Sequence, residues 1–238
     1  MKHLHRSFYL ALVLIFFIPF RPAFYFLGKN VSKNRSRIIR LRRTLASLAS
    51  RFAGFNYKFS IDQPIDWSRN YIICANHTSN LDITVLMKVC KADFSFMGKE
   101  ELLHNPVTGF FFRTIDIPVN RTSKISSYKA FKRAKEYLDE GKSIAIFPEG
   151  GISDEFPPVL QKFKNGVFKL AVDANIPILP IVIEDAWKIY WDDGAKYGTE
   201  PGTVKVHVLK PIETAGLNLT ADELHEMVYK LYKENWII

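Results

Sequence analysis

The sequence predicts an α/β fold: a mixed, largely parallel sheet flanked by helices and preceded by an N-terminal helical segment. From residue 57 onward, short β-branched or aromatic runs alternate with segments of helical periodicity, which is typical of α/β layers. The 238 residues are enough for one such domain. Residues 1–61 differ, because they hold the longest apolar run and no acidic residue. We therefore expect an N-terminal segment over residues 1–56 and one domain over residues 57–238.

The composition excludes several classes of protein. Apolar residues make up 47% of the chain and charged residues 24%, so it is neither disordered nor a polytopic membrane protein. Two cysteines are too few for a disulfide scaffold or a thiolate metal cluster, and they favour a reducing compartment. The chain has no phosphate-binding P-loop, dinucleotide fingerprint, G-x-S-x-G or H-E-x-x-H motif, which argues against the corresponding chemistries.

The net charge of +9 belongs to the N-terminal quarter alone. Residues 1–61 carry 12 Lys and Arg, whereas residues 62–238 carry 21 Lys and Arg against 24 Asp and Glu, a net charge of −3. The same quarter contains the apolar run Phe8–Phe20. A cationic and apolar segment without acids suits an anionic membrane surface, and no nucleic-acid-binding motif is present. We therefore expect a membrane partner and no nucleic acid.

The apolar run is short for a straight membrane-spanning helix. Its 13 residues would reach about 20 Å, against about 30 Å for the hydrocarbon core. Extension to Leu27 gives 20 residues but includes Arg21 and two prolines. A straight span can accommodate this sequence, and a kinked or re-entrant pair of helices accommodates it better. A cleaved signal peptide is the alternative, although no small-x-small cleavage site follows the run.

A basic amphipathic helix is expected next. Residues 29–43 hold seven cations, and apolar side chains recur there and beyond at spacings of three and four residues. The apolar stripe contains Ile38, Leu41, Leu45, Leu48, Phe52 and Phe55. Lying mostly off the stripe are Arg37, Arg40, Arg42, Arg43 and Arg51. Such a helix lies in the lipid interface, packs on the main domain, or does both. The prediction is a protein anchored to the cytoplasmic face of a membrane.

Six strands are expected in the main domain: Tyr71–Ala75, Phe94–Met97, Ile115–Val119, Ser143–Phe147, Ile178–Ile183 and Val204–Leu209. A helix between the third and fourth strands places on one face Ile125, Tyr128, Phe131, Ala134 and Leu138. Gly141 ends that helix, and further helices are expected at Gly166–Ala174 and Leu219–Trp236.

A histidine and a carboxylate are spaced for catalysis directly after the first of these strands. Residues 76–82 read Asn-His-Thr-Ser-Asn-Leu-Asp. Catalytic groups in open α/β sheets gather at the carboxyl ends of strands. Asp82 falls in the first turns of the next helix, where it can hold one imidazole nitrogen of His77 and leave the other to take a proton. A helix cap or a satisfied polar pair is the alternative, so a second feature is required.

Three downstream blocks supply that feature. Residues 147–151 read Phe-Pro-Glu-Gly-Gly at the end of the fourth strand, and glycine permits close approach of a ligand. Residues 117–121 read Ile-Pro-Val-Asn-Arg and end the third strand with a cation. Residues 176–181 read Ile-Pro-Ile-Leu-Pro-Ile and form an apolar wall. The order and spacing of the blocks favour one shared site.

With these blocks in this order, the chain resembles the glycerolipid acyltransferase family typified by bacterial 1-acyl-glycerol-3-phosphate acyltransferase. The resemblance runs from about Tyr71 to Val182. The family's H-x-x-x-x-D motif corresponds to His77 and Asp82, and its other blocks correspond to Ile117–Arg121, Phe147–Gly150 and Leu179–Ile181. Residues 99–102 and 164–166 are similar to two intervening family signatures.

The resemblance implies a membrane-bound O-acyltransferase of phospholipid biosynthesis. It would move a fatty acyl group from acyl-CoA or an acylated acyl carrier protein to the free hydroxyl of 1-acyl-glycerol-3-phosphate, giving phosphatidic acid. His77 would deprotonate the hydroxyl as it attacks the thioester, and Asp82 would hold the productive tautomer and stabilise the imidazolium. The thioester is a co-substrate, and neither a bound cofactor nor a metal is expected.

Further residues are expected to bind substrate. Backbone amides at Gly150 and Gly151 are the expected donors to the developing oxyanion. Glu149 would bind the acceptor's hydroxyls or hold its loop. Arg121 and Lys99 would bind the acceptor's phosphate.

One departure from the family bears on the acceptor. Lysophosphatidate-using members commonly continue Phe-Pro-Glu-Gly with Thr-Arg-Ser, whereas Gly151-Ile152-Ser153 follows here. The missing arginine removes a charge-assisted donor that could hold a phosphate. Arg121, Lys99, Lys162 or Lys164 can compensate. Otherwise the acceptor is another lysophospholipid or a lyso-amino-acid lipid.

Other functions stay open on the sequence. A catalytically silent membrane-binding module could keep this fold, and a lysophospholipase could use water as the acceptor. Cys74 is a conceivable acyl-carrying nucleophile. It lies within an apolar strand, where a raised thiol pKa and core packing are expected.

Overall fold

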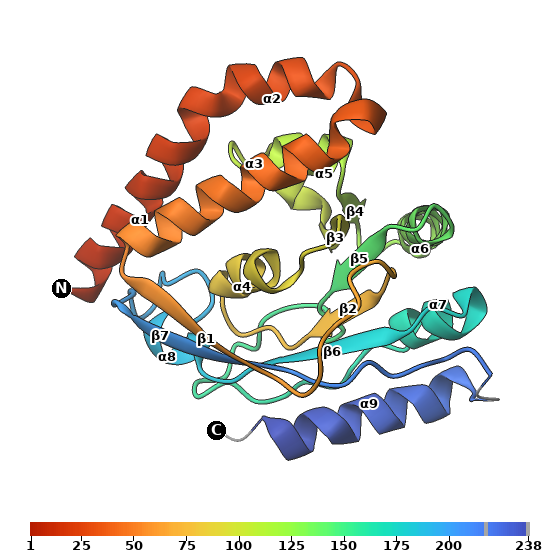
Figure 1. The fold of residues 1–238 in the computed structure, drawn as a ribbon. Helices are drawn as coiled ribbons and strands as arrows, with labels where there is room; N and C mark the ends of the chain where they lie inside the picture. The colour runs from red at the N-terminus through yellow and green to blue at the C-terminus, as the bar shows by residue number, and fades with distance from the viewer. Residues whose placement is uncertain (217–218, 237–238) are drawn as a thin grey trace.

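The computed structural model describes residues 1–216 and 219–236 and confirms the α/β fold (Figure 1). The strands are β1 (Phe55–Ile61), β2 (Ile72–Ala75), β3 (Phe94–Lys99), β4 (Ile117–Val119), β5 (Ser143–Ile146), β6 (Ile178–Ile183) and β7 (Gly202–Val208). The N-terminal helices are α1 (Lys2–Phe17), the 3-10 turn η1 (Ile18–Phe20), α2 (Arg21–Gly28) and α3 (Val31–Phe52). The later helices are α4 (Leu81–Val89), η2 (Glu100–His104), α5 (Gly109–Thr114), α6 (Lys124–Asp139), α7 (Gly166–Ala174), α8 (Ala186–Ile189) and α9 (Ala221–Asn235).

Within the described residues these strands form one seven-stranded sheet in the order β1-β7-β6-β2-β5-β3-β4. All neighbours are parallel except β6 and β7, which are antiparallel. β2 lies in the centre, so the loop that follows it opens at the middle of the sheet's carboxyl edge. This is the position that an open α/β sheet offers to a ligand.

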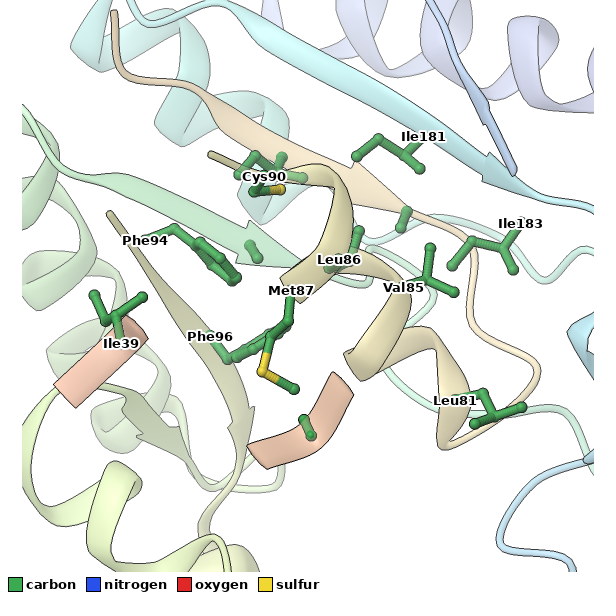
Figure 2. Packing of buried hydrophobic residues seen from close by; sticks show 14 of the residues in the cluster. Ile39, Leu81, Val85, Leu86, Met87, Cys90, Phe94, Phe96, Ile181 and Ile183 are labelled. Carbon is green, nitrogen blue, oxygen red and sulfur yellow. The ribbon is translucent and has the colours of Figure 1, made fainter. Parts of the chain in front are cut away.

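Two apolar layers cover the sheet because successive side chains of a strand point to opposite faces. Ile73 of β2 joins a layer with α3, α4 and α5, whereas Ile72 joins a layer with α6, α7 and α9. Figure 2 shows α4 directing Val85, Leu86 and Met87 against side chains of the sheet. Strands β2 and β6 are buried on both faces, which explains their continuous apolar sequences, whereas β1 and β7 at one edge of the sheet are partly exposed.

The expected strands agree with the structure except near two helix ends. The strand expected at Ile178–Ile183 has the observed bounds, and the others differ by a few residues. Ile115 ends α5 instead of opening β4. Strand β1 was missed because Phe55 continues the helical spacing of α3. Gly54, at φ +78°, ends the helix and turns Phe55 into the strand.

The N-terminal segment is a kinked pair of helices followed by a long return helix. The turn η1 separates α1 from α2, with prolines at Pro19 and Pro22, and Figure 1 shows α3 running back alongside them. By length and composition the stretch Lys2–Gly28 could cross a membrane, and few of its residues are buried in the protein. The expected boundary between residues 56 and 57 falls within β1.

Helix α3 packs part of its apolar stripe against the domain: Ile38 and Leu45 are buried, whereas Phe52 at the end of the helix is exposed. The expectation that Arg42 lies off this stripe is wrong. Its side chain is buried, pairs with Asp116 at 2.6 Å and lies over the ring of Phe111. A buried ion pair needs a fixed geometry to offset desolvation, so this pair fixes α3 on the sheet.

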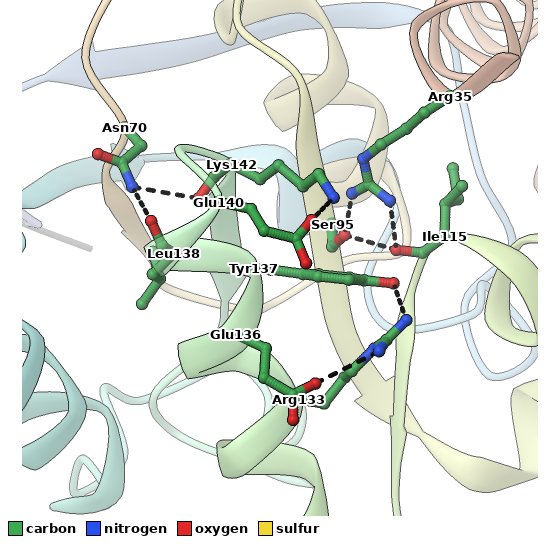
Figure 3. A network of polar contacts seen from close by, with 10 residues as sticks. All are labelled: Arg35, Asn70, Ser95, Ile115, Arg133, Glu136, Tyr137, Leu138, Glu140 and Lys142. Carbon is green, nitrogen blue, oxygen red and sulfur yellow. Dashed lines mark hydrogen bonds and ion pairs between the residues drawn. The ribbon is translucent and has the colours of Figure 1, made fainter. Parts of the chain in front are cut away.

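Arg35 makes a second buried contact from α3. Figure 3 shows its guanidinium beside the Tyr137 ring, and it donates to the Ser95 hydroxyl at 2.5 Å. Ser95 in turn donates to the Ile115 carbonyl. Two arginines of the basic segment therefore stabilise the domain and do not face lipid.

Candidate active site

The loop after β2 is held at its start by Asn76. The Asn76 side-chain amide donates to the Ile183 carbonyl at 2.8 Å, and the Ile183 N–H donates to the Asn76 Oδ1 at 2.7 Å. This side chain therefore continues the pairing of β2 with β6 beyond Ala75. As a result, residue 77 leaves the sheet in a fixed direction.

His77 and Asp82 form the expected pair. His77 Nδ1 and Asp82 Oδ2 are 2.9 Å apart, and Oδ2 also accepts from the backbone N–H groups of Thr78 and Ser79. Since Oδ2 is the acceptor for these donors, Nδ1 carries the hydrogen and Nε2 has a free lone pair. The Asp82 side chain is fully buried and that of His77 is 15% exposed. The carboxylate is therefore fixed, and the imidazole remains accessible.

The Phe-Pro-Glu turn after β5 contacts the same histidine. The ring of Phe147 stacks on the imidazole with centroids 3.9 Å apart and an interplanar angle of 13°. Glu149 Oε1 accepts from the His77 backbone N–H at 3.3 Å. The two sequence blocks are therefore brought together, as expected, and Glu149 holds the loop of the histidine.

Burial raises the pKa of Glu149 well above its ordinary value. The backbone hydrogen bond from His77 opposes this shift, and the nearby Asp82 charge adds to it. Two carboxyl groups thus flank His77 in different environments. Asp82 accepts three hydrogen bonds on one oxygen, whereas Glu149 is shielded from water with a single backbone donor.

A cavity of about 140 Å³ lies beside this turn. Its walls come mainly from apolar side chains of the sheet, α6 and α7, and two cations line it, Arg121 and Lys164. Gly150, at φ +82°, also lines it, and a Cβ there would lie 2.7 Å from Lys164 Cε. Glycine at this position lets the lysine cross the turn. Gly151 faces the other cation, because its Cβ would lie 3.8 Å from an Arg121 guanidinium nitrogen.

The expected oxyanion donors are not equivalent. The Gly150 N–H donates to the Phe147 carbonyl at 3.1 Å, so that amide closes the turn and is not free for substrate. The Gly151 N–H has no hydrogen-bond acceptor within residues 1–216 and 219–236. Of the two expected donors, only the Gly151 N–H is therefore available to a ligand.

Lys99 does not join the cavity. It is exposed at the carboxyl end of β3, opposite Val119 of β4, and it is absent from the cavity lining. Arg121, two residues beyond Val119, does line the cavity. Of the cations that could replace the missing arginine, the structure brings together Arg121 and Lys164.

Sequence reasoning missed a second segment that holds the loop of His77. The Asp192 N–H donates to the Thr78 carbonyl, and the Asn80 N–H donates to the Asp192 carbonyl, both at 2.9 Å. Asp192 adopts φ +51°, a left-handed conformation that Asp tolerates better than most residues. Burial raises the pKa of the Asp192 carboxyl, and nearby His77 and Lys99 oppose the shift. No local pattern predicts this contact, because more than one hundred residues separate its partners.

Cys74 is part of the core. Its side chain is fully buried, and burial raises the pKa of its thiol. It lies on the face of β2 opposite to Ile73 and Ala75, among side chains of the α6–α7 layer. A nucleophilic role for this thiol is therefore excluded by its inaccessibility.

The fold and this site define an acyltransferase. The profile of the family described as Acyltransferase matches residues 56–184, more than half of the chain, and the chain belongs to this family. It is homologous to 1-acyl-sn-glycerol-3-phosphate acyltransferases. The 1-acyl-sn-glycerol-3-phosphate acyltransferase alpha of Mus musculus is 27% identical in sequence, and the match covers 96% of this chain and 80% of that protein. The enzyme of Saccharomyces cerevisiae is 30% identical over 68% of this chain and 52% of its own length.

The chain spans between about half and two thirds of the length of several curated relatives, including 65% of an uncharacterized acyltransferase of Schizosaccharomyces pombe. Among solved structures, the 1-acyl-sn-glycerophosphate acyltransferase of Thermotoga maritima aligns with a TM-score of 0.81. The alignment covers 98% of this chain and 94% of that one at 21% sequence identity. At this identity the likeness shows a shared fold alone. Because the alignment covers nearly the whole chain, that shared fold includes the N-terminal helices.

Proposed function

We propose that this protein transfers a fatty acyl group from a thioester to the free hydroxyl of 1-acyl-glycerol-3-phosphate at a membrane surface, giving phosphatidic acid. The observation that carries the proposal is the His77–Asp82 pair, whose imidazole stacks on Phe147, a residue that lines the cavity with two cations. An intact pair of this kind argues against a catalytically silent module. The donor is acyl-CoA or an acylated acyl carrier protein, used as a co-substrate without a bound cofactor.

His77 acts as the general base in this mechanism. Its Nε2 takes the proton of the acceptor hydroxyl while the hydroxyl oxygen attacks the thioester carbonyl. Asp82 keeps Nδ1 protonated and balances the charge of the imidazolium. The tetrahedral intermediate carries its negative charge on the former carbonyl oxygen, to which the Gly151 N–H donates. Collapse expels the thiolate, which takes the proton back from Nε2 and leaves as the free thiol.

The cations of the cavity argue for a phosphate-bearing acceptor. Arg121 and Lys164 line it together, and no carboxylate is among its lining residues. Two cations in a partly apolar cavity suit a phosphomonoester. They offer a replacement for the arginine that commonly follows this motif in lysophosphatidate-using members and that this chain lacks. A lysophospholipid with a larger head group or a lyso-amino-acid lipid is the alternative acceptor.

The N-terminal helices place this chemistry at the membrane in the proposal. Exposed apolar side chains cluster on α1, η1 and α2, including Ile15, Ile18 and Phe26, and acidic residues are absent before Asp62. These helices would sit in the cytoplasmic face of an anionic membrane. Acceptor and product could then enter and leave without passing through water.

A panel of acceptors tests the function. The purified full-length protein receives one labelled acyl-CoA and, in turn, lysophosphatidate, neutral and anionic lysophospholipids, and a lyso-amino-acid lipid. Product masses identify the acceptor. We expect phosphatidic acid as the main product with wild type and its loss with His77→Ala. Release of free fatty acid without any diacyl product would instead favour a lysophospholipase.

A further inference from the structure

A second cavity, separate from the active site, lies between the N-terminal helices and α5. It has a volume of about 340 Å³ and shares no lining residue with the cavity beside Gly150. A volume of this size falls within the range of small-molecule sites. The cavity is formed by the kinked pair α1–α2 on one side and residues 106–114 on the other.

The inner wall of this cavity is apolar. Phe17 and Phe24 come from the N-terminal helices, and Phe110 comes from α5, with the Phe24 and Phe110 rings 5.3 Å apart. Gly28 lets the two sides approach, because a Cβ there would lie 2.9 Å from the Phe110 ring. Such a wall accommodates hydrocarbon and offers a polar group no partner.

Three cations line the same cavity: Arg21, Lys29 and Arg113. No Asp or Glu is among its lining residues, and none of the three cations forms an ion pair within the part of the chain that the structure describes. Arg113 donates to the Leu103 carbonyl, and Lys29 lies over the Tyr25 and Phe26 rings. Three uncompensated cations around one cavity favour an anion as the occupant.

The surroundings of the cavity indicate where that anion comes from. The N-terminal segment that forms one side of the cavity also carries exposed apolar side chains: Ile18, Phe20, Tyr25 and Phe26. Aromatic side chains next to cations are typical of the interface between lipid head groups and hydrocarbon. A ligand with one anionic group and one hydrocarbon chain matches both the cations and the apolar wall.

We propose that this cavity binds one anionic phospholipid, with its phosphate among Arg21, Lys29 and Arg113 and the start of an acyl chain along Phe17, Phe24 and Phe110. The proposal rests on the membrane association that is part of the proposed function, but not on the reaction. The bound lipid would be a resident of the membrane and not the acceptor, because the acceptor's phosphate is assigned to Arg121 and Lys164.

The test measures binding of short-chain lipid monomers to the full-length protein in neutral detergent. The probes are dihexanoyl-phosphatidylglycerol, dihexanoyl-phosphatidylcholine and inorganic phosphate, titrated by calorimetry. We expect saturable one-to-one binding of phosphatidylglycerol, with phosphatidylcholine and inorganic phosphate weaker by about tenfold or more. Arg21→Gln/Lys29→Gln should weaken phosphatidylglycerol binding by about tenfold to thirtyfold. This double variant leaves the contact between Arg113 and Leu103 in place.

The matched control is Lys33→Gln/Arg40→Gln, which removes two exposed cations of α3 that do not line the cavity. It should bind phosphatidylglycerol within about twofold of wild type. The charge-preserving double variant Arg21→Lys/Lys29→Arg should also bind phosphatidylglycerol about as tightly as wild type, unlike Arg21→Gln/Lys29→Gln. Equal weakening by both Gln doubles would reduce the effect to net charge and overturn the proposal. Tight binding of inorganic phosphate, or a loss confined to Arg121→Gln/Lys164→Gln, would also overturn it. His77→Ala should keep lipid binding, so failure of the reaction and failure of this site are distinguishable.

Discussion

The described residues, 1–216 and 219–236, contain two histidine–aspartate pairs with similar N–O distances and different surroundings. His77 Nδ1 lies 2.9 Å from Asp82 Oδ2, and His207 Nε2 lies 2.6 Å from Asp62 Oδ1. The first pair has a fully buried carboxylate and follows the central strand β2. The second links the ends of β1 and β7 near the sheet edge, with its side chains 26% and 41% exposed. Distance alone therefore does not distinguish a catalytic base from a surface contact.

Three features of the surroundings separate the pairs. Asp82 is fixed by two backbone donors in addition to the imidazole, whereas Asp62 has one, the Lys210 N–H. His77 stacks on Phe147 and leaves Nε2 open, whereas His207 uses Nε2 in its contact. Only the first pair faces the turn that carries Glu149 and Gly150. The buried carboxylate of Asp82, its backbone hydrogen bonds and the open Nε2 of His77 therefore distinguish the proposed base.

Replacement of the two histidines gives the largest expected difference. His77→Ala should lower acyl transfer by about 10²–10⁴-fold, because it removes the general base. His207→Ala should leave transfer within about twofold of wild type, because that pair contacts no substrate-binding group. Turnover of labelled acyl-CoA at saturating acceptor measures both. Retention of more than about a tenth of wild-type activity by His77→Ala would reject the assignment.

The aspartates extend the comparison. Asp82→Asn keeps the size of the side chain but removes the charge that fixes the tautomer, so transfer should fall by about tenfold or more. Asp62→Asn should have no measurable effect on transfer. Melting temperatures of both variants show whether the fold is intact. Equal activities of the two folded variants would contradict the role of Asp82.

Two arginine pairs test burial by stability. Arg42→Met leaves Asp116 as an uncompensated buried carboxylate and should lower the free energy of unfolding by about 3–5 kcal/mol. Arg69→Met breaks the exposed pair with Glu213 and should cost about 0–1 kcal/mol. Chemical denaturation of the full-length protein in detergent measures both changes. Similar losses would show that α3 is not fixed by its buried arginine.

Gly150 and Gly141 form a matched pair of glycines, with φ +82° and +77°. Alanine at either position should cost about 1–2 kcal/mol of stability. A Cβ at Gly150 would also displace Lys164, whereas a Cβ at Gly141 meets nothing within 4 Å. Only Gly150→Ala should raise KM for lysophosphatidate, by about tenfold. If Gly141→Ala raised KM for lysophosphatidate equally, the rise in KM would result from lost stability and not from the displacement of Lys164.

The smallest expected effect concerns the pH dependence of stability. Because burial raises the folded-state pKa of Glu149, the unfolded chain releases this proton first as pH rises. The stability contribution is fully present below the ordinary Glu pKa of about 4.3 and is lost as pH rises through the raised folded-state value. Glu149→Gln keeps an oxygen that accepts from the His77 N–H. Because glutamine does not titrate, this variant does not lose stability through deprotonation at residue 149. Its melting temperature should therefore fall less than that of wild type between about pH 5 and pH 8. Identical pH profiles would contradict the buried state of Glu149.

Prediction from sequence succeeded where the signals are local. His77 and Asp82 are five residues apart, across a strand end and the first turn of a helix, so their spacing nearly determines their contact. The alternating apolar and polar residues of β1 predict a strand, but Phe55 also continues the helical spacing of α3, so the strand was not predicted. The role of Arg42 was not readable, because its acidic partner comes from a segment 74 residues away.

The sequence by itself determined the α/β class, the kink at the N-terminal prolines, the contact between His77 and Asp82, and the family. These follow from periodicity, backbone chemistry and short motifs, which act over a few residues. Only the tertiary structure decided that Arg121 and Lys164 share a cavity, that Asp192 holds the loop of His77 and that Gly150 uses its amide to close a turn. These depend on which atoms remain unpaired after the sheet has formed, and contacts between distant segments set that outcome.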